Sequence, residues 1–277
     1  VVLMLNQRGF APIVSCPACG FFARCESCLL AMTYHVQDRL LICHGCAKTL
    51  PPISTCPVCA YTPLGYMGVG TERLVEACEA RFPKAKIARL DQDVLRKSRK
   101  NAFAILDDLK NGRLDILVGT QMIAKGLDVP RVTLAAVVFA DTGLNLPDFR
   151  SRERSFELLA QVIGRSGRHS SPGRAVIQTM QPQNPAVECS VNEELQKFYE
   201  NELAARRQAD WPPFTRLIRI LVQSTQAPRA LQTIREIHGM IKGAYTEIST
   251  SDPVPSPRPK LNDNYRFQIL LKLPINS

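Results

Sequence analysis

The spacing of apolar residues changes along this chain, and the changes separate regions of different structure. From residue 65 onward, short apolar runs alternate with segments in which apolar residues recur every three or four positions. The runs predict strands and the spaced segments predict helices. Residues 1–5 predict a buried strand, whereas residues 15–62 show no helical periodicity.

The alternating pattern predicts an α/β lobe. Strands are expected at residues 1–5, 86–90, 115–118, 133–140 and 175–179, and helices at 72–81, 101–109 and 156–163. Strands separated by helices favour a parallel sheet that binds ligands at the carboxyl ends of its strands. Beyond a Pro/Asn/Gln stretch at 180–185, we expect a helix at 193–207, a strand at 216–222, a helix at 229–242, a Pro-rich loop at 253–259 and a strand at 265–273.

These elements divide the chain into four segments. Residues 1–14 hold the first strand of the lobe, 15–62 an inserted module, 63–183 the remainder of the lobe, and 184–277 a small α+β domain. The chain begins inside an apolar run, without an initiator Met, and it ends just after a second apolar run. We therefore expect it to be part of a longer protein. It has no run of about 18 apolar residues, so no membrane span is expected.

The formal charge of +10 favours an anionic partner, most often nucleic acid. A basic protein with no polyanion partner is the alternative. The charge depends on the cysteines, because eight thiolates would remove eight charges and two zinc ions would restore four, which leaves +6. The basic excess is then modest.

Eight of the ten cysteines lie within 44 residues as four Cys-x-x-Cys pairs. Each pair directs two thiolates at one point, so four pairs can complete two tetrahedral zinc sites. A redox dithiol would need one pair on a thioredoxin-like frame, and iron–sulfur ligation is the other alternative. Reduced, metal-bound cysteines predict a cytoplasmic protein.

Loop lengths favour a nested pairing of the four knuckles. Fourteen residues separate the second and third knuckles, enough for a hairpin, whereas only five separate the first and second. The inner zinc site is then Cys25, Cys28, Cys43 and Cys46, and the outer is Cys16, Cys19, Cys56 and Cys59. A sequential pairing is the alternative, and His44 could replace a cysteine.

A closed four-cysteine site is most simply a structural staple. The module could also form a nucleic-acid or protein contact surface. That surface would use basic residues and aromatic residues expected to be exposed: Arg24, Arg39, Lys48, Phe21, Phe22 and Tyr34.

Two stretches of the lobe suit phosphate chemistry. After an apolar strand, Thr120 offers a hydroxyl, Gly126 permits close backbone approach, and Asp128 can orient a ribose or an arginine. On a later helix, Gln161, Arg165 and Arg168 fall on one face, where both arginines can reach a triphosphate. A helix with a solvated basic face is the simpler interpretation of the second stretch.

Both stretches resemble motifs of the superfamily 2 helicases. GTQMIAKGLD at 119–128 resembles motif V, and QVIGRSGR at 161–168 resembles motif VI. LNQRGFAP at 5–12, the four knuckles after it and GVGTER at 68–73 are similar to one family, the primosomal replication-restart (PriA) helicases. The resemblance covers nearly the whole chain.

The resemblance implies a second RecA-like helicase lobe, interrupted by a two-zinc ribbon-like module and followed by a C-terminal DNA-binding domain. It implies an ATP-dependent 3′→5′ DNA helicase that recognises stalled or branched forks. Other primosome proteins and single-stranded-DNA-binding protein would be its partners.

The resemblance also implies residue roles. Arg165 and Arg168 would contact ATP phosphates, and Gln161 would position the nucleotide or water. Gly126 and Asp128 would lie near the nucleotide. Thr120, Gln121 and Lys125 would lie near the DNA backbone.

The chain has no G-x-x-x-x-G-K-[ST] loop and no acidic Mg²⁺ motif. ATP and Mg²⁺ would therefore be held by a lobe outside this sequence, and this chain alone should not hydrolyse ATP. Two other classes stay open at this point: a stand-alone zinc-ribbon DNA-binding or adaptor protein with an inert lobe, and a thiol oxidoreductase.

Overall fold

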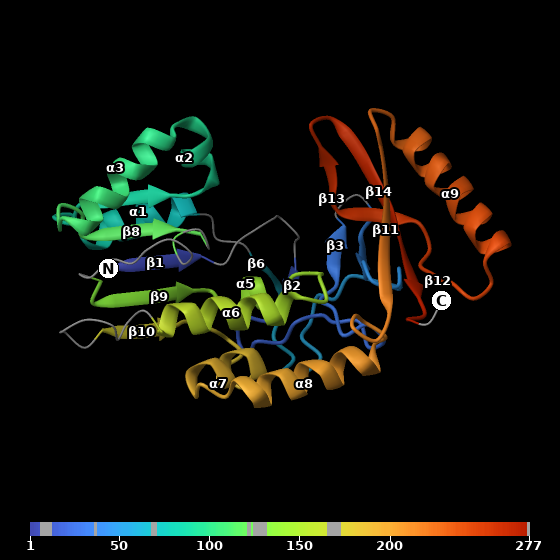
Figure 1. Ribbon diagram of the computed structural model, residues 1–277, viewed down its shortest axis with the longest axis horizontal. Coiled ribbons are helices and arrows are strands. Elements are labelled where there is room, and N and C mark those ends of the chain that lie inside the picture. Colours follow the sequence, from blue (N-terminus) through green and yellow to red (C-terminus); the bar gives the residue numbers. More distant parts are fainter. Residues whose placement is uncertain are drawn as a thin grey trace. The chain divides into compact units, whose positions relative to one another are not determined.

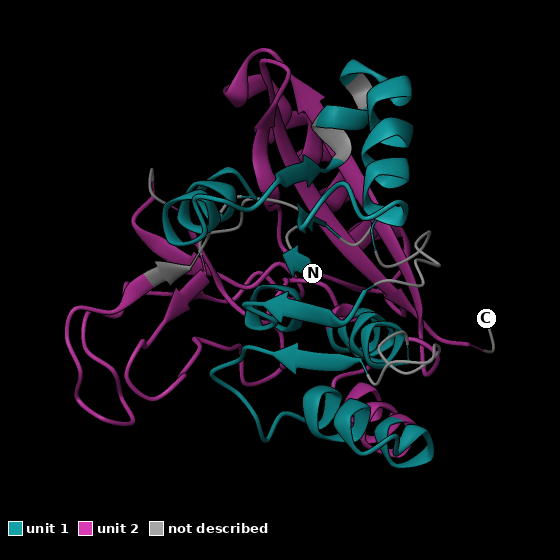
Figure 2. Cartoon of the chain, turned by 90° about the vertical axis from the view of Figure 1, so that its left-hand side faces the viewer, with its two compact units in different colours: residues 1–8, 68–144, 152–198 teal, residues 9–67, 145–151, 199–277 magenta. Residues whose placement is uncertain are grey.

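A computed structural model describes residues 1–5, 13–35, 38–67, 71–120, 123, 132–164 and 173–275. The chain forms two compact units, coloured separately in Figure 2, and each is interrupted in sequence by the other. Unit 1 comprises residues 1–8, 68–144 and 152–198, and unit 2 comprises residues 9–67, 145–151 and 199–277.

Unit 1 is built on a five-stranded parallel sheet in the order β10-β9-β1-β8-β7. Its strands are β1 (Val2–Leu5), β7 (Ile87–Leu90), β8 (Ile116–Gly119), β9 (Leu134–Val138) and β10 (Arg174–Ile177). Every neighbouring pair is parallel, so all five carboxyl ends meet at one edge of the sheet. The first strand of the chain lies at the centre of this sheet (Figure 1).

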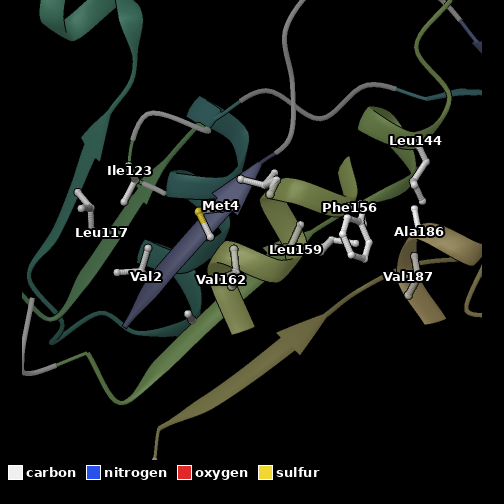
Figure 3. Packing of buried hydrophobic residues seen from close by; sticks show 14 of the residues in the cluster. Val2, Met4, Leu117, Ile123, Leu144, Phe156, Leu159, Val162, Ala186 and Val187 are labelled. Carbon is white, nitrogen blue, oxygen red and sulfur yellow. The ribbon is translucent and has the colours of Figure 1, made fainter. Parts of the chain in front are cut away.

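The helices of unit 1 bury the sheet's apolar side chains. They are α1 (Thr71–Arg81), α2 (Gln92–Lys97), α3 (Arg99–Lys110), α5 (Asp141–Leu144), α6 (Ser151–Ile163) and α7 (Pro185–Val191). Figure 3 shows Val2 and Met4 of β1 beside Leu159 and Val162 of α6. All four side chains are at least 95% buried, so β1 is a core strand. The predicted parallel α/β lobe is confirmed.

Helices α6 and α7 depart from the prediction by more than the one or two residues seen at the ends of the helices expected at 72–81, 101–109, 193–207 and 229–242. Helix α6 begins at Ser151 and not at residue 156, because its polar first turn carries no apolar signal. Helix α7 occupies a stretch where only a boundary was expected. Asn184 caps it by accepting a hydrogen bond from the Ala186 amide at 3.1 Å, and Pro185 fills the first helical position.

The cysteine region of unit 2 forms a five-stranded antiparallel sheet in the order β5-β4-β3-β2-β6. Its strands are β2 (Ile13–Ser15), β3 (Thr33–His35), β4 (Leu40–Ile42), β5 (Thr49–Leu50) and β6 (Gly65–Met67). Met32 and Leu41 are completely buried, so the region has an apolar core in addition to its cysteines.

The C-terminal part of the chain forms a second antiparallel sheet in the order β11-β14-β12, with β13 also pairing with β14. Its elements are α8 (Leu195–Gln208), β11 (Arg216–Ser224), α9 (Ala227–Ala244), β12 (Ser249–Thr250), β13 (Val254–Leu261) and β14 (Asn264–Leu273). Helix α9 lies along this sheet and contributes Ile234 to a core with Ile269 and Leu271 (Figure 1).

The loop expected at residues 253–259 is wrong, because β13 covers most of it. Four prolines, three of them within β13, favour a loop in the sequence, since a proline cannot donate to a strand ladder. They are tolerated here because β13 is an edge strand that pairs with β14, and an edge strand can lack some amide donors. Among the described residues, every helix is too short or too polar to cross a membrane.

Candidate metal centre and the carboxyl edge of the parallel sheet

The structure gathers eight cysteines into two tetrads. The outer tetrad contains Cys16, Cys19, Cys56 and Cys59, and the inner tetrad contains Cys25, Cys28, Cys43 and Cys46. Within each tetrad, the four sulfur atoms lie within 4.8 Å of one another. These sets are those of the nested pairing and not of the sequential alternative. His44 belongs to neither.

All four knuckles share one backbone design. In each, the amide of the residue after the second cysteine donates to the carbonyl of the first, at 2.8–3.0 Å. That residue adopts a positive φ in every case: Gly20, Leu29, Ala47 and Ala60. Three of the four are not glycine, so the turn holds a left-handed conformation that ordinarily favours glycine. The same turn therefore recurs in all four Cys-x-x-Cys knuckles.

The sulfur geometry fits zinc. Tetrahedral coordination with zinc–sulfur bonds of about 2.3 Å places sulfur atoms about 3.8 Å apart. The observed Sγ–Sγ distances are 3.6 Å for Cys16–Cys59, Cys19–Cys56 and Cys25–Cys46. Every cysteine is free of disulfide bonding. The donor sets could therefore hold two zinc ions in closed four-cysteine coordination.

Crowding of the thiols perturbs their ionisation. The Cys28 thiol hydrogen-bonds to Cys43, which raises the pKa of Cys28 above its ordinary range and lowers the pKa of Cys43 to about 5. Burial raises the pKa of Cys25 to about 11. The thiols can therefore not all ionise by themselves, and a divalent cation among them would favour the thiolate form of all four.

The two tetrads differ in exposure. Cys19 and Cys59 of the outer tetrad are exposed, whereas the inner tetrad has three buried cysteines and one half-buried. Val58, between two outer ligands, is 70% exposed. The outer site is thus open to solvent on the side of Cys19 and Cys59 and buried on the side of Cys16 and Cys56, whereas the inner site lies within the core of unit 2.

The expected contact surface of the module is partly wrong. Phe22 is buried with Ile13 and Ala31, and Phe21 and Tyr34 pack against the cysteine core. Their aromatic character is used for packing, which the sequence pattern could not distinguish from exposure. Two of the basic residues are engaged as well. Arg24 donates to Asn145 Oδ1 at 2.8 Å, and Lys48 pairs with Glu26 at 3.2 Å.

The carboxyl edge of the parallel sheet is the second candidate site. Thr120 follows β8 there. Gln161 lies exposed near the end of α6, the helix that leads from the carboxyl side of β9 back toward the start of β10, so the structure does not bring it to this edge. Gly119 packs tightly at the same edge, because a Cβ atom there would lie 2.1 Å from the Leu90 carbonyl oxygen of β7. This close approach explains the glycine that begins the first phosphate-suited stretch.

Two buried aspartates at this edge did not stand out in the sequence. Asp141 accepts hydrogen bonds from the Thr179 hydroxyl and the Met180 amide, both at 3.0 Å, and so joins the ends of β9 and β10. Asp91 follows β7 and accepts from the Thr71 hydroxyl at 3.0 Å. Both carboxylates have partners, so they organise the edge. Their position just after predicted strands was the available signal.

Six predicted residues lie outside the described part of the chain. They are Gln121, Lys125, Gly126, Asp128, Arg165 and Arg168. The roles expected of them stay predictions. Of the predicted nucleotide and DNA residues, only Thr120 and Gln161 are placed by the structure.

Two protein families match segments of the chain. Residues 68–170 match the helicase conserved C-terminal domain, and residues 207–277 match the primosomal protein N C-terminal domain. Among solved structures, the C-terminal domain of the DEAD-box protein Dbp5 is similar with a TM-score of 0.33 and 16% identity. That similarity covers 50% of this chain and 78% of the other, and nothing is inferred from it.

Curated relatives match nearly the whole chain. The replication restart protein PriA of Bacillus subtilis is 41% identical over 275 residues, which is 98% of this chain and 34% of that protein. PriA of Treponema pallidum is 38% identical over 274 residues, which is 99% of this chain and 41% of that protein. The chain spans about a third of the length of the first of these relatives. It belongs to the PriA family of replication restart proteins and corresponds to their C-terminal part.

Proposed function

We propose that this chain supplies the second motor lobe, a two-zinc module and the C-terminal DNA-binding domain of an ATP-dependent 3′→5′ DNA helicase. The whole protein restarts replication at stalled or branched forks by assembling a primosome. The observation that carries this proposal is the match of residues 68–170 to a helicase C-terminal domain, within a chain similar to PriA over 98% of its length.

In this proposal, ATP lies in the cleft between this lobe and a lobe outside this chain. Arg165 and Arg168 reach the ATP phosphates, since a planar guanidinium binds phosphate oxygens at two points and stabilises the charge that develops during transfer. Gln161 positions the nucleotide or the attacking water. Gly126 and Asp128 line the nucleotide side, and the rest of the ATP and Mg²⁺ site belongs to a lobe outside this chain.

DNA lies on the same lobe in this proposal. The Thr120 hydroxyl, Gln121 and Lys125 contact the backbone near the end of β8. Exposed hydroxyl, amide and ammonium donors suit phosphate oxygens. Other primosome proteins and single-stranded-DNA-binding protein are the proposed protein partners.

The arginine role is tested in the full-length protein. We expect Arg165→Ala to lower kcat for ATP hydrolysis by a factor of about 10³ or more, the range measured for arginines that act on a transferring phosphoryl group. DNA affinity should change little. Arg235→Ala is the matched control, because Arg235 lies exposed on α9 of unit 2. Unchanged hydrolysis in Arg165→Ala would favour the alternative, an adaptor protein with an inert lobe.

The zinc sites are structural in this proposal. Closed four-thiolate coordination leaves no open position for catalysis, so the metals stabilise the fold of the cysteine region. Elemental analysis of the purified chain should give two zinc ions per molecule. One ion or none would defeat the two-site assignment.

A further inference from the structure

One indole side chain joins both knuckles of the inner tetrad. Trp211 is 3% exposed, and its Nε1–H donates to the Cys28 carbonyl oxygen at 3.1 Å, across 183 residues of sequence. Its ring also packs on the other knuckle. A Cβ atom at Gly45 would lie 3.0 Å from Cζ2 of Trp211 and 3.1 Å from Cys28 Sγ. Trp211 therefore contacts the turn of Cys28 through a hydrogen bond and the turn of Gly45 through packing.

The same indole is held by the C-terminal sheet. Lys272 of β14 places its Nζ 4.2 Å from the centre of the Trp211 ring and donates to the Ala209 carbonyl at 2.7 Å. Leu270, two residues earlier, belongs to an apolar cluster that holds three inner cysteines together with Cys16 and Cys56 of the outer tetrad. Gln268, two residues earlier again, donates through Nε2 to the His44 carbonyl oxygen at 3.4 Å. Alternate residues of one strand thus face the cysteine region. The direct contacts of Trp211 distinguish the two tetrads, because its hydrogen bond and its packing reach the inner knuckles.

The two tetrads are therefore placed differently with respect to this sheet. The inner knuckles share Trp211 with β14, and Trp211 and Leu270 are both at least 92% buried. The outer tetrad exposes two of its four cysteines to solvent. Removal of a metal from a buried centre must disturb the side chains that pack on it. A centre that faces solvent on one side has fewer such side chains.

We propose that Trp211 is a positioning residue that makes the C-terminal sheet depend on metal at the inner tetrad and not at the outer one. This inference rests on the proposed binding of zinc by both tetrads. Loss of the inner metal lets the knuckles of Cys28 and Gly45 separate. The buried indole N–H then loses its acceptor, and the packing of Leu270 and Lys272 is lost with it.

The chain carries its own probe for this coupling, because Trp211 is its only tryptophan. Two double variants remove one site each: Cys25→Ser with Cys46→Ser for the inner tetrad, and Cys19→Ser with Cys59→Ser for the outer. Zinc per chain, the wavelength of Trp211 emission and hydrogen exchange of the β14 amides are measured on both.

We expect each double variant to keep one zinc ion. The outer variant should retain the wild-type emission and slow β14 exchange. The inner variant should show a red-shifted emission and β14 exchange faster by at least about tenfold. An inner variant with wild-type emission and exchange would overturn the coupling. A wild-type chain without zinc would instead overturn the metal assignment, and the coupling with it.

A milder variant keeps the test informative if the inner double variant does not fold. Trp211→Phe preserves most of the ring and removes the hydrogen bond to Cys28. One neutral buried hydrogen bond corresponds to about a fivefold effect, so zinc should leave the inner site about five times faster in excess chelator. Release from the outer site should not change, and Tyr61→Phe, near the outer tetrad, should alter neither phase. Equal inner-site release in Trp211→Phe and wild type would overturn the role of Trp211.

Discussion

Replacing Gly119 with alanine would place one carbon atom where the parallel sheet has no room for it. The added Cβ would lie 2.1 Å from Ile123 Cδ1 and 2.1 Å from the Leu90 carbonyl oxygen. The Ile123 side chain can rotate away. The Leu90 carbonyl cannot, because Leu90 pairs with Gly119 in the ladder between β7 and β8. The alanine variant must therefore displace β7 from β8 at the carboxyl edge.

The cost follows from two contributions. Overpacking a well-filled core costs about 1–3 kcal/mol. Each strand hydrogen bond lost at the end of the ladder adds about 1 kcal/mol. We expect Gly119→Ala to lower the free energy of unfolding by roughly 3–4 kcal/mol, a large share of the 5–15 kcal/mol typical of a folded domain.

A second glycine-to-alanine substitution serves as a control that should raise the free energy of unfolding. Gly239 lies exposed in α9, and a Cβ atom there would meet nothing within 4 Å. Gly239→Ala should raise stability by about 0.8–1 kcal/mol, because alanine favours a helix interior over glycine by that amount. Urea unfolding followed by far-ultraviolet circular dichroism measures both changes. If Gly119→Ala unfolds at the wild-type midpoint, the close approach of β7 to β8 is refuted.

Three further predictions concern charge and capping. Arg206→Met should lower the free energy of unfolding in urea by about 3–5 kcal/mol, because it removes the ion pair at 2.9 Å from the Glu202 carboxylate, whose side chain is only 4% exposed. Arg113→Met is the control: its pair with Asp108 is exposed, so the loss should be under about 1 kcal/mol. Ser98→Ala should cost about 1 kcal/mol by the same assay, because the Ser98 hydroxyl caps α3, and no loss would contradict the cap. Burial lowers the pKa of His35 below 6.5, so below that pH the unfolded chain binds a proton that the folded chain does not, and stability falls as the pH drops. His35→Gln should lose less stability than wild type between pH 7.5 and pH 5.5, and an equal loss would contradict this origin.

The sequence predicted unit 1 well because its elements obey local rules. Strands and helices of the lobe were recognisable from apolar spacing, and most of their boundaries differ by a few residues. The errors arose where the local signal was weak or ambiguous. The first turn of α6 is polar, and the prolines of β13 are as typical of a loop as of an edge strand. The start of α7 does carry a local signal, because Asn184 caps the helix and Pro185 is its first residue.

The candidate metal centre was predictable for a different reason. Loop lengths favour the nested grouping over the sequential one without any knowledge of packing, and the structure shows the nested sets. The partners of the inner tetrad were not predictable. The contact between Trp211 and Cys28 joins residues 183 positions apart, and no local pattern indicates which distant side chain will cover a buried turn. Asp91 and Asp141 were missed because a single aspartate after a strand is common.

The interleaving of the two units has a consequence for biosynthesis. The cysteine region leaves the ribosome before the residues that complete its core. From Cys46 to Trp211 the chain runs 165 residues, which takes roughly 8–33 s at about 5–20 residues per second. During that interval the core of the cysteine region, which includes Leu30, Met32 and Leu41, lacks its contacts with the C-terminal residues. A metal bound in the nascent chain would then have to hold the knuckles together. The cysteine region then serves as a template for the C-terminal sheet, and a cell short of zinc would lose newly made molecules before mature ones.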